Sequence, residues 1–491
     1  MTGLTSRSIA KAPATAATPQ YDRNACGVGI VHLGLGAFHK AHQAFYTDAA
    51  LAAEGGDWKI IGVSMRNEQV AADFNAQDGL FTILEKGNDG AKAQIIGSID
   101  HAVCARTQPE QVLDALCDAN VRVVTTTVTE KGYGIDRATG GLDLSNPVIA
   151  QDLTRDSAPV GVIGLIVTAL ARRRTRGIAP FTVLCCDNLP ENGTFLRAGL
   201  IDFANRYDTD LGQWIADTVA CPSSMVDRIT PAQTADTRAL AQELTGSEDV
   251  LAIETESFHQ WVIEDNFPTG RPAWDAAGAI FTNDVAAYEK MKLRLLNGSH
   301  SLIAYMGQLL GKQYVRDVMA DPCLEAIVRR HLEEVSATLP ALPDIDLPQY
   351  RADLIARFRN PNIAHETLQI ASDGSEKMPQ RIFAPAADAI AHNLSIQSGA
   401  FATAVWMWYC KRGGKGMDDR AINDPRADLL RAAAQGDTPD EILSAFERMP
   451  GLFPKELSES PAWRKSVLGV LGDLAENPIE QVVETTFGRI S

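Results

Sequence analysis

Short runs of β-branched residues alternate with longer helical patterns through the first half of this 491-residue chain. Strands are expected at residues 29–33, 59–64, 121–128 and 181–186, with helical patterns between them at residues 42–54, 108–118 and 160–174. Parallel strands need a long crossover between them, and a helix is the usual one. The alternation therefore predicts an α/β fold built on a parallel sheet. Further strand patterns lie at residues 81–84, 94–96 and 250–255.

The pattern changes after about residue 283. From there apolar residues recur with helical spacing, at residues 285–310, 324–338, 349–359, 386–396, 399–411 and 440–448 and again beyond residue 460. A chain of this length is too long for one hydrophobic core. We therefore expect a flexible tail at residues 1–25, a Rossmann-type dinucleotide-binding domain at residues 26–284 and a mostly α-helical substrate-binding domain at residues 285–491.

The formal net charge of −17 argues against a nucleic-acid partner, because phosphates require a basic surface. No apolar run approaches the length of about 18 residues that a membrane helix needs, and no secretory signal segment is present at the N-terminus. The eight cysteines are scattered without a CxxC pair, which is typical of reduced thiols. We expect a cytoplasmic, monomeric enzyme that acts on a small molecule.

The segment Gly34-Leu-Gly-Ala-Phe-His39 follows the first expected strand and precedes a helical pattern. Two glycines in such a turn let the backbone bend tightly and approach a pyrophosphate, which a helix N-terminus then stabilises. His39 stands where the usual fingerprint has a third glycine, and such turns also need glycine for reasons unrelated to ligands. The context favours phosphate binding. The expected cofactor-binding residues are Gly34, Leu35, Gly36, Ala37 and Phe38.

The choice of cofactor depends on the end of the second expected strand, where an acidic side chain usually binds the ribose diol of NAD. Ser64-Met-Arg66-Asn67 occupies that place, and the nearest acid is Glu68. Arg66 fits two alternatives, which are binding of the 2′-phosphate of NADP and stacking on adenine. We expect Arg66 to bind the cofactor, with NAD as the expected cofactor and NADP as the open alternative.

Residues 292–300 place an amine, an amide and an imidazole in an otherwise apolar helical pattern. On an α-helix at about 100° per residue, Asn297 lies roughly 140° round from Lys292, with His300 between them at about 80°. A partly desolvated lysine is suited to base chemistry. An amide and an imidazole beside it can hold an oxygen while the base takes its proton. This combination is what oxidation of an alcohol requires, although a lone lysine would more often be a surface residue.

Two polar motifs end expected strands of the first half. Asp187-Asn188 follows residues 181–186, and Glu130 follows residues 121–128. Catalytic and ligand-binding groups of parallel sheets lie at the carboxyl ends of strands, and an asparagine there can donate to a developing oxyanion. Turn formation and capping are the structural alternatives for both motifs.

Three further charged residues lie in possible binding segments. Asp227 precedes Arg228 between apolar residues, and the alternative to a ligand role is a structural ion pair. Lys377 and Arg381 are cations in a segment before a helical pattern, where most such residues are only solvated.

These motifs, in this order, resemble those of the polyol-specific long-chain dehydrogenases, the family of mannitol 2-dehydrogenase and fructuronate reductase. The resemblance covers roughly residues 27 to 410 and rests on residues 32–42, 77–82, 129–133, 186–190, 225–231, 292–300 and 370–379. It implies a metal-independent, nicotinamide-dependent alcohol dehydrogenase with a Rossmann-type domain and a helical C-terminal domain. Met65 and Arg66 replace the acidic residues that make some members specific for NAD, so the cofactor preference is not carried over.

The resemblance also implies roles for individual residues. Lys292 resembles the general base that takes the hydroxyl proton. Asn188 and Asn297 resemble the pair that stabilises the resulting oxyanion, and His300 resembles the group that orients the reacting hydroxyl. Asp227 and Lys377 resemble residues that bind other substrate hydroxyls, and Glu289, one turn before Lys292, lies where it can help move protons out. Apart from the resemblance, we also expect Glu130 and Arg381 to bind the substrate.

The predicted reaction is reversible oxidation of a C2-type secondary hydroxyl of an open-chain polyol or sugar acid. Mannitol to fructose is the first expectation, and D-mannonate to D-fructuronate is the alternative. A non-catalytic dinucleotide-binding sensor would be expected to lack at least one of the four catalytic residues, and all four are present. A zinc enzyme would need clustered Cys and His ligands, whereas His39 and His42 have no cysteine near them in sequence, so no metal is expected.

Overall fold

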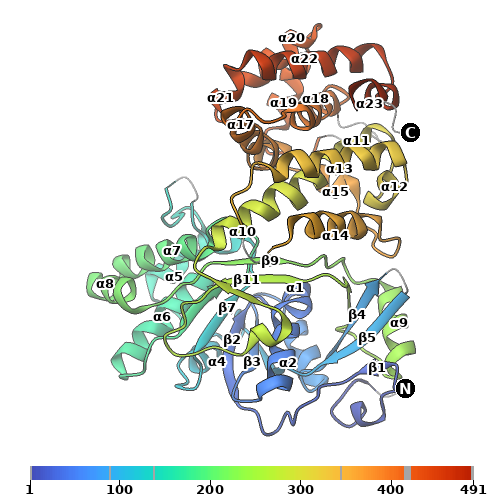
Figure 1. Ribbon diagram of the computed structural model, residues 1–491. Coiled ribbons are helices and arrows are strands. Elements are labelled where there is room, and N and C mark those ends of the chain that lie inside the picture. The colour runs from blue at the N-terminus through green and yellow to red at the C-terminus, as the bar shows by residue number, and fades with distance from the viewer. Residues whose placement is uncertain (1–2, 88–89, 137–138, 343–344, 414–421, 488–491) are drawn as a thin grey trace. The chain divides into compact units, whose positions relative to one another are not determined.

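The computed structural model describes residues 3–87, 90–136, 139–342, 345–413 and 422–487, and Figure 1 shows the elements along the chain. The chain divides into two compact units, Met1–Ala286 and Ala287–Ser491. The first contains a parallel central sheet with helices between its strands and two smaller mixed sheets, and the described part of the second consists mainly of helices. The predicted fold class is therefore confirmed.

The central sheet of the first unit has the strand order β6-β3-β2-β7-β8, and all its pairings are parallel. Its strands are β2 (Val28–Leu33), β3 (Lys59–Ser64), β6 (Ile99–Cys104), β7 (Val123–Thr126) and β8 (Thr182–Cys185). From β2 the chain moves outward through β3 to β6 and then returns to the other side of β2 to form β7 and β8. The strand order thus reverses between β2 and β7. In such sheets ligands bind beyond the carboxyl ends of the strands at this reversal.

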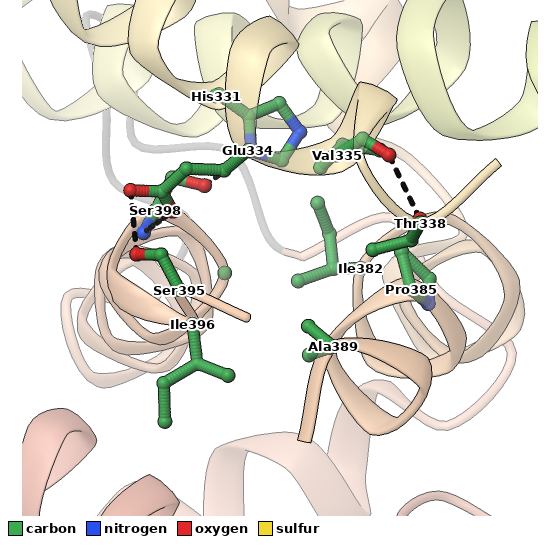
Figure 2. A pocket seen from close by; sticks show the side chains of 12 residues that line it. His331, Glu334, Val335, Thr338, Ile382, Pro385, Ala389, Ser395, Ile396 and Ser398 are labelled. Carbon is green, nitrogen blue, oxygen red and sulfur yellow. Dashed lines mark hydrogen bonds between the residues drawn. The ribbon is translucent and has the colours of Figure 1, made fainter. Parts of the chain in front are cut away.

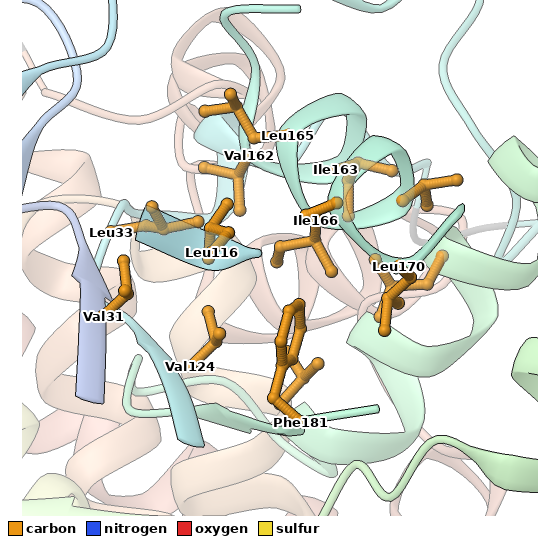
Figure 3. Packing of buried hydrophobic residues seen from close by; sticks show 14 of the residues in the cluster. Val31, Leu33, Leu116, Val124, Val162, Ile163, Leu165, Ile166, Leu170 and Phe181 are labelled. Atoms are coloured by element: carbon orange, nitrogen blue, oxygen red, sulfur yellow. The ribbon is translucent and has the colours of Figure 1, made fainter. Parts of the chain in front are cut away.

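Both faces of the central sheet are buried, which explains why its strands are continuous apolar runs. Val31 and Leu33 enter one hydrophobic cluster, whereas Ile30 enters another, because successive side chains of a strand point to opposite faces. The first cluster includes side chains of α4 (Pro109–Leu116) and α6 (Val162–Thr175), and Figure 3 shows residues of α6 packed over the strands. Side chains of α2 (Gln43–Glu54) belong to the second cluster.

Two smaller sheets complete the strands of this unit, in the orders β1-β5-β4-β10 and β12-β11-β9. Their strands are β1 (Ala16–Ala17), β4 (Phe81–Gly87), β5 (Gly90–Ile96), β9 (Ser224–Asp227), β10 (Ile253–Glu256), β11 (Gln260–Glu264) and β12 (Ile280–Thr282). The remaining helices are η1 (Ile9–Lys11), α1 (Ala37–Ala41), α3 (Glu68–Ala76), η2 (Glu130–Gly132), α5 (Pro147–Thr154), α7 (Asn192–Tyr207), α8 (Thr209–Thr218), α9 (Ala235–Thr245) and η3 (Trp274–Ala277).

The N-terminal segment differs from the flexible tail that its composition predicts. Strand β1 pairs in parallel with β5, and Leu4 is fully buried in a small cluster with Leu80 and Ile95. The Arg23 side chain donates hydrogen bonds to the carbonyl oxygens of Gly97 and Asp78 at 2.8 and 2.7 Å. Residues 3–25 are therefore held by backbone pairing and by partners far along the chain, which composition does not reveal.

The helix expected at residues 42–54 is also different in detail. Helix α2 matches the expected range from Gln43 onward, but the short helix α1 precedes it and was not expected; the two are separated at His42, whose backbone angles of φ −120° and ψ −91° are not helical. Strand β6 was not expected, because only part of it is apolar: Asp100 and His101 are partly exposed at the edge of the sheet.

In the second unit, α10 (Val285–Lys292), η4 (Leu293–Asn297) and α11 (Gly298–Leu309) follow one another without a break, as the helical pattern at residues 285–310 predicts. Nearly all of α11 is buried, and it packs against α13, α15 and α18. The other helices are α12 (Val315–Met319), α13 (Pro322–Ser336), α14 (Leu347–Arg359), α15 (Thr367–Ala371), α16 (Gly374–Met378), η5 (Pro379–Phe383), α17 (Ala384–Ala391), α18 (Gln397–Lys411), α19 (Ala427–Ala433), α20 (Pro439–Glu447), α21 (Lys455–Ser458), α22 (Pro461–Glu476) and α23 (Ile479–Phe487). Among the described residues, no helix combines the length and apolar character that a membrane crossing requires.

Candidate active site

A cavity of about 1050 Å³ lies in the first unit, at the carboxyl ends of the central strands. Its lining contains the turn after β2 (Gly34, Leu35 and Gly36), the segment after β3 (residues 64–67), Arg106 after β6 and Thr127 after β7. Four strand ends thus contribute, including the two at the reversal of strand order. This is the position at which a sheet of this topology binds a nucleotide.

Glycine is suited to positions 34 and 36 of the turn for two different structural reasons. Gly34 has a φ of +106°, and a Cβ there would lie 2.1 Å from the Thr127 carbonyl oxygen, so only glycine fits. The Thr127 hydroxyl in turn donates to the Gly34 carbonyl oxygen at 2.9 Å. A Cβ on Gly36 would meet only the Gly34 carbonyl oxygen, at 3.7 Å. The open space over Gly36 therefore fits the close approach of a pyrophosphate. Ala37 and Phe38 follow in α1, outside the lining of the cavity.

His39, which replaces the third glycine of the fingerprint, forms part of the support beneath this turn. Its ring stacks on that of His32 with the centroids 3.5 Å apart, and both residues are fully buried. The His32 ring is held by the hydroxyls of Thr125 and Thr127 at 2.8 and 2.9 Å. Burial lowers the pKa of His32 to about 3, so this histidine is neutral at physiological pH. Sequence reasoning missed this cluster, because the contacts of His32 with Thr125 and Thr127 depend on the pairing of β2 with β7.

Asp187 and Asn188 have different environments at the end of β8. The Asp187 carboxylate accepts hydrogen bonds from the Tyr133 hydroxyl at 2.6 Å and from the backbone N–H groups of Val128 and Thr129 at 3.0 and 3.2 Å. It therefore ties the end of β8 to the loop after β7. Asn188 is exposed, whereas Glu130, in η2, is half-buried. The end of β8 thus leaves the Asn188 amide exposed, while the neighbouring Asp187 holds the loop after β7.

Asp227 is the last residue of β9 and is buried. The adjacent Arg228 guanidinium donates to the carbonyl oxygens of Ala41 and Glu256, at 2.6 and 3.3 Å, and pairs with the Glu85 carboxylate at 3.4 Å. These contacts give Arg228 a structural role in joining α1 to the smaller sheets.

In the second unit, Lys292 closes α10, Asn297 closes η4 and His300 lies in the first turn of α11. Their exposed fractions are 6%, 8% and 7%, so all three are buried. Segment η4 is π-helical, with the Gly298 N–H donating to the carbonyl oxygen of Leu293, five residues earlier. An i→i+5 turn contains more residues than an α-helical turn, so residues five apart are separated by a smaller angle around the axis than in an α-helix. The α-helical separation of roughly 140° predicted for Lys292 and Asn297 is therefore wrong.

The polar atoms of Asn297 and His300 are available for a ligand. Among the described residues, neither Asn297 Nδ2 nor His300 Nε2 has a hydrogen-bond partner, and both atoms are buried. Because an unpaired buried polar atom is costly, such atoms commonly mark a site that a ligand or water completes. The His300 ring contacts those of Phe358 and His365, each with a centroid distance of 4.9 Å. Burial, followed by the charge of His365, holds the pKa of His300 well below its usual value, so the ring is neutral.

Lys377 and Arg381 are both engaged with the chain. The Lys377 ammonium donates to the carbonyl oxygens of Ser372 and Ile370 at 2.7 and 3.3 Å, and burial lowers its pKa. Arg381 lies in the π-helical segment η5, and its guanidinium donates to the Asn297 carbonyl oxygen at 3.3 Å. The second unit therefore brings Arg381 to Asn297 directly. Glu289 lies one turn before Lys292 and is half-buried.

A second, much smaller cavity lies in the second unit beside α13, α17 and α18. Figure 2 shows His331, Glu334 and Ser398 on one side and Ile382 and Ala389 on the other. Its volume of about 10 Å³ has room for one water molecule but not for a sugar. Among the described residues, no group of three or more His, Cys, Asp or Glu side chains could hold a metal ion.

The reversed parallel sheet and its glycine-lined cavity define a Rossmann-type dinucleotide-binding protein. Residues 28–276 match the mannitol dehydrogenase Rossmann domain, and residues 284–467 match the mannitol dehydrogenase C-terminal domain. The chain belongs to the mannitol dehydrogenase family, as the sequence motifs predict. It is an NAD(P)-dependent oxidoreductase that acts on CH–OH groups.

Three relatives illustrate the range of this family. The chain is 39% identical to D-mannonate oxidoreductase of Escherichia coli strain K12, over 95% of this chain and 97% of that protein. The ternary complex of Pseudomonas fluorescens mannitol 2-dehydrogenase with NAD and D-mannitol has a TM-score of 0.84 and 35% identity, covering 99% of this chain and 100% of that one. Substrate-free D-sorbitol dehydrogenase has a TM-score of 0.90 and 32% identity, covering 98% and 100%.

Proposed function

We propose that this protein reversibly oxidises the C2-type secondary hydroxyl of an open-chain polyol, with mannitol to fructose as the favoured reaction and NAD or NADP as the cofactor. Residues 26–284 bind the cofactor in this proposal, and residues 285–491 supply most of the substrate site. The observation that carries it is the buried face of residues 292–300, where Lys292 accompanies two polar side chains with unpaired atoms. The D-mannitol and NAD held by the Pseudomonas relative support the choice of substrate and cofactor.

Lys292 is the proposed general base. Two features support this role: Lys292 directly precedes the π-helical segment that ends at Asn297, and it is buried, which keeps competing water away from it. The Lys292 amine takes the proton of the reacting hydroxyl, and half-buried Glu289 passes that proton outward. When bound, the nicotinamide supplies the hydride chemistry. General base catalysis of this kind typically contributes a factor of about 10² to 10⁴.

Asn297 and Asn188 are the proposed donors to the oxyanion that forms as the proton leaves. A side-chain amide aimed at a developing negative charge stabilises it without reorganising, which is worth roughly 3–4 kcal/mol for a single donor. His300 is neutral and can donate from Nε2 to the same oxygen or orient the hydroxyl before the reaction. Asp227, Glu130, Lys377 and Arg381 are proposed to contact the remaining substrate hydroxyls.

Gly34, Leu35 and Gly36 are proposed to hold the pyrophosphate, with Ala37 and Phe38 continuing the turn. The fit rests on the open space over Gly36 and on the position of the cavity at the strand reversal. Arg66 lines the same cavity at the end of β3 and is proposed to contact the adenosine half of the cofactor.

Turnover of fructose and of fructuronate, each with NADH and with NADPH, tests this function. The expected result is that fructose gives the highest kcat/KM of the two sugars. Inactivity on all four pairs would contradict the proposed reaction. Higher kcat/KM with fructuronate would instead establish the alternative, a D-fructuronate reductase.

The alternative has support of its own, because the D-mannonate oxidoreductase of Escherichia coli is similar over nearly the whole chain. A uronate substrate needs a cation for its carboxylate. Lys377 already donates to two carbonyl oxygens, and Arg381 donates to Asn297 and Ser301. Because both cations already donate hydrogen bonds to the chain, a neutral polyol is favoured over a sugar acid as the substrate. A non-catalytic sensor, the alternative of a different class, would bind NADH without turnover of any sugar.

A further inference from the structure

The lining of the large cavity has an unusual charge for this protein. The chain carries 62 acidic and 45 basic residues. Yet the described residues that line the cavity include three cations, Arg66, Arg106 and Lys131, and neither Asp nor Glu. Cations in the lining of a cavity attract phosphates.

Arg66 and Arg106 follow the ends of two neighbouring strands, although they are far apart in the sequence. Strands β3 and β6 pair in parallel, and Ser64 and Cys104 are register partners. The Ala105 N–H donates to the Ser64 carbonyl oxygen at 2.9 Å, which extends the pairing beyond the strands. Arg66 lies two residues after Ser64, and Arg106 lies two residues after Cys104. The backbones of the two arginines therefore lie beyond neighbouring strand ends, and both residues line the cavity there.

Both side chains are exposed and available for a ligand. Within the described parts of the chain, neither guanidinium has a hydrogen-bond or ion-pair partner, and both residues line the cavity. The backbone beneath Arg66 is fixed, because the Ser64 hydroxyl donates to the Asn67 carbonyl oxygen at 2.7 Å and the Asn67 side chain caps α3. Glu68, the nearest acid, lies in the first turn of α3 and is not among the residues that line the cavity.

We propose that Arg66 and Arg106 form a binding site for the 2′-phosphate of NADP(H), so that the protein uses NADP(H) at least as well as NAD(H). The end of the second strand is where a Rossmann fold recognises the ribose, with an acid for the free diol or an arginine for its phosphate. Two guanidinium groups offer paired, charge-assisted hydrogen bonds to a phosphate. This inference rests on the proposed use of a nicotinamide dinucleotide at this cavity.

Calorimetric titration of the full-length protein with 2′,5′-ADP and with 5′-AMP tests the site without requiring turnover. The two probes differ only in the 2′-phosphate. We expect 2′,5′-ADP to bind at least tenfold more tightly, with an advantage that declines as salt is added, because exposed ionic contacts are screened. Equal affinities for the two probes would overturn the inference.

Arg66→Ala and Arg106→Ala should each reduce the affinity for 2′,5′-ADP about tenfold while leaving that for 5′-AMP within twofold. Arg238→Ala is the matched control, because Arg238 is an exposed arginine of α9 in the same unit and does not line the cavity. The assignment would be contradicted if the two test variants lost affinity for both probes, or if the ratio of the affinities for 2′,5′-ADP and 5′-AMP stayed the same. Both arginines are exposed, so neither substitution threatens the core.

Comparison of NADPH with NADH in fructose reduction separates this inference from the proposed function. Activity with NADH that exceeds activity with NADPH would overturn the inference and leave the proposed function intact. Inactivity with both, combined with tight binding of 2′,5′-ADP, would overturn the proposed reaction and support the site. Arg66→Asp should shift the kcat/KM ratio toward NADH by at least tenfold, because it restores an acceptor for the ribose diol.

Discussion

The Arg381 guanidinium donates a hydrogen bond to the Asn297 carbonyl oxygen at 3.3 Å and another to the Ser301 hydroxyl at 3.2 Å. These contacts join the π-helical segment η5 to the end of η4 and the first turn of α11. Burial lowers the pKa of Arg381 to about 10, which leaves the guanidinium charged at neutral pH. Arg381 thus holds the backbone of the residue that is the proposed oxyanion donor.

Arg381→Met is expected to lower kcat about tenfold or more, since displacement of a catalytic group by about 1 Å can cost 10²-fold. It should also raise KM, because Arg381 is proposed to contact a substrate hydroxyl. Steady-state kinetics with fructose measure both constants. Arg381→Lys keeps the charge and should recover part of kcat. If KM rises and kcat is unchanged, Arg381 only binds substrate and does not position Asn297.

Lys292→Ala should bind NADH normally but lose turnover by about 10² to 10⁴, because only the base is removed. Quenching of protein fluorescence by NADH measures the binding, and single-turnover kinetics measure the loss. Lys290→Ala is the control, since Lys290 lies on the same helix and pairs with Asp388 at 3.3 Å. Equal effects of the two substitutions would exclude Lys292 as the base.

The two glycines of the turn should respond differently to alanine. Gly34→Ala places a Cβ against the Thr127 carbonyl oxygen at a positive φ and should lower the melting temperature of the protein. Gly36→Ala meets no such neighbour and should leave the melting temperature unchanged while weakening NADH binding. A Gly36→Ala variant that binds NADH as well as the parent would show that the pyrophosphate does not approach this residue.

Acid should destabilise the fold through buried histidines. Burial lowers the pKa of His32 and of His42 from 6.5 to about 3. The unfolded chain therefore binds more protons below pH 6.5, and stability present above that pH is lost as the pH falls toward 3, at up to about 1.4 kcal/mol per pH unit for each histidine. Asp48, whose pKa burial raises to about 6, opposes this loss between pH 6 and its unfolded value of 3.8.

Thermal unfolding at pH 7 and pH 5 measures this effect. The melting temperature should fall between the two, and it should fall less in His42→Gln, whose side chain does not titrate. A variant with the same decrease as the parent would exclude His42 as a source of the acid sensitivity.

Dialysis against a chelator should leave the activity unchanged, because the proposed base, oxyanion donors and hydroxyl-binding groups are all side chains of the protein. Metal content measured before and after dialysis completes this experiment. Activity that is lost and then restored by Zn²⁺ would contradict the proposed mechanism.

Much of the architecture was predictable because its signals are local. Apolar runs predicted β2, β3, β7 and β8, since buried parallel strands are continuous apolar segments. The glycines at positions 34 and 36 predicted the turn, because a positive φ and close backbone approach restrict the residue type at that place alone. The edge strand β6 was missed because its exposed residues break the apolar run.

The amino-acid sequence alone determined the α/β and helical halves, the family and the identity of the polar residues, because periodicity and motifs are properties of neighbouring positions. The tertiary structure decided which distant residues act together. The pairing of β3 with β6 puts Arg106 next to Arg66, and the pairing of β2 with β7 fixes the turn after β2. Segment η5 packs against the π-helical segment η4, which separates Lys292 from Gly298. Contacts between residues far apart in the chain set these registers, so a local pattern cannot encode them.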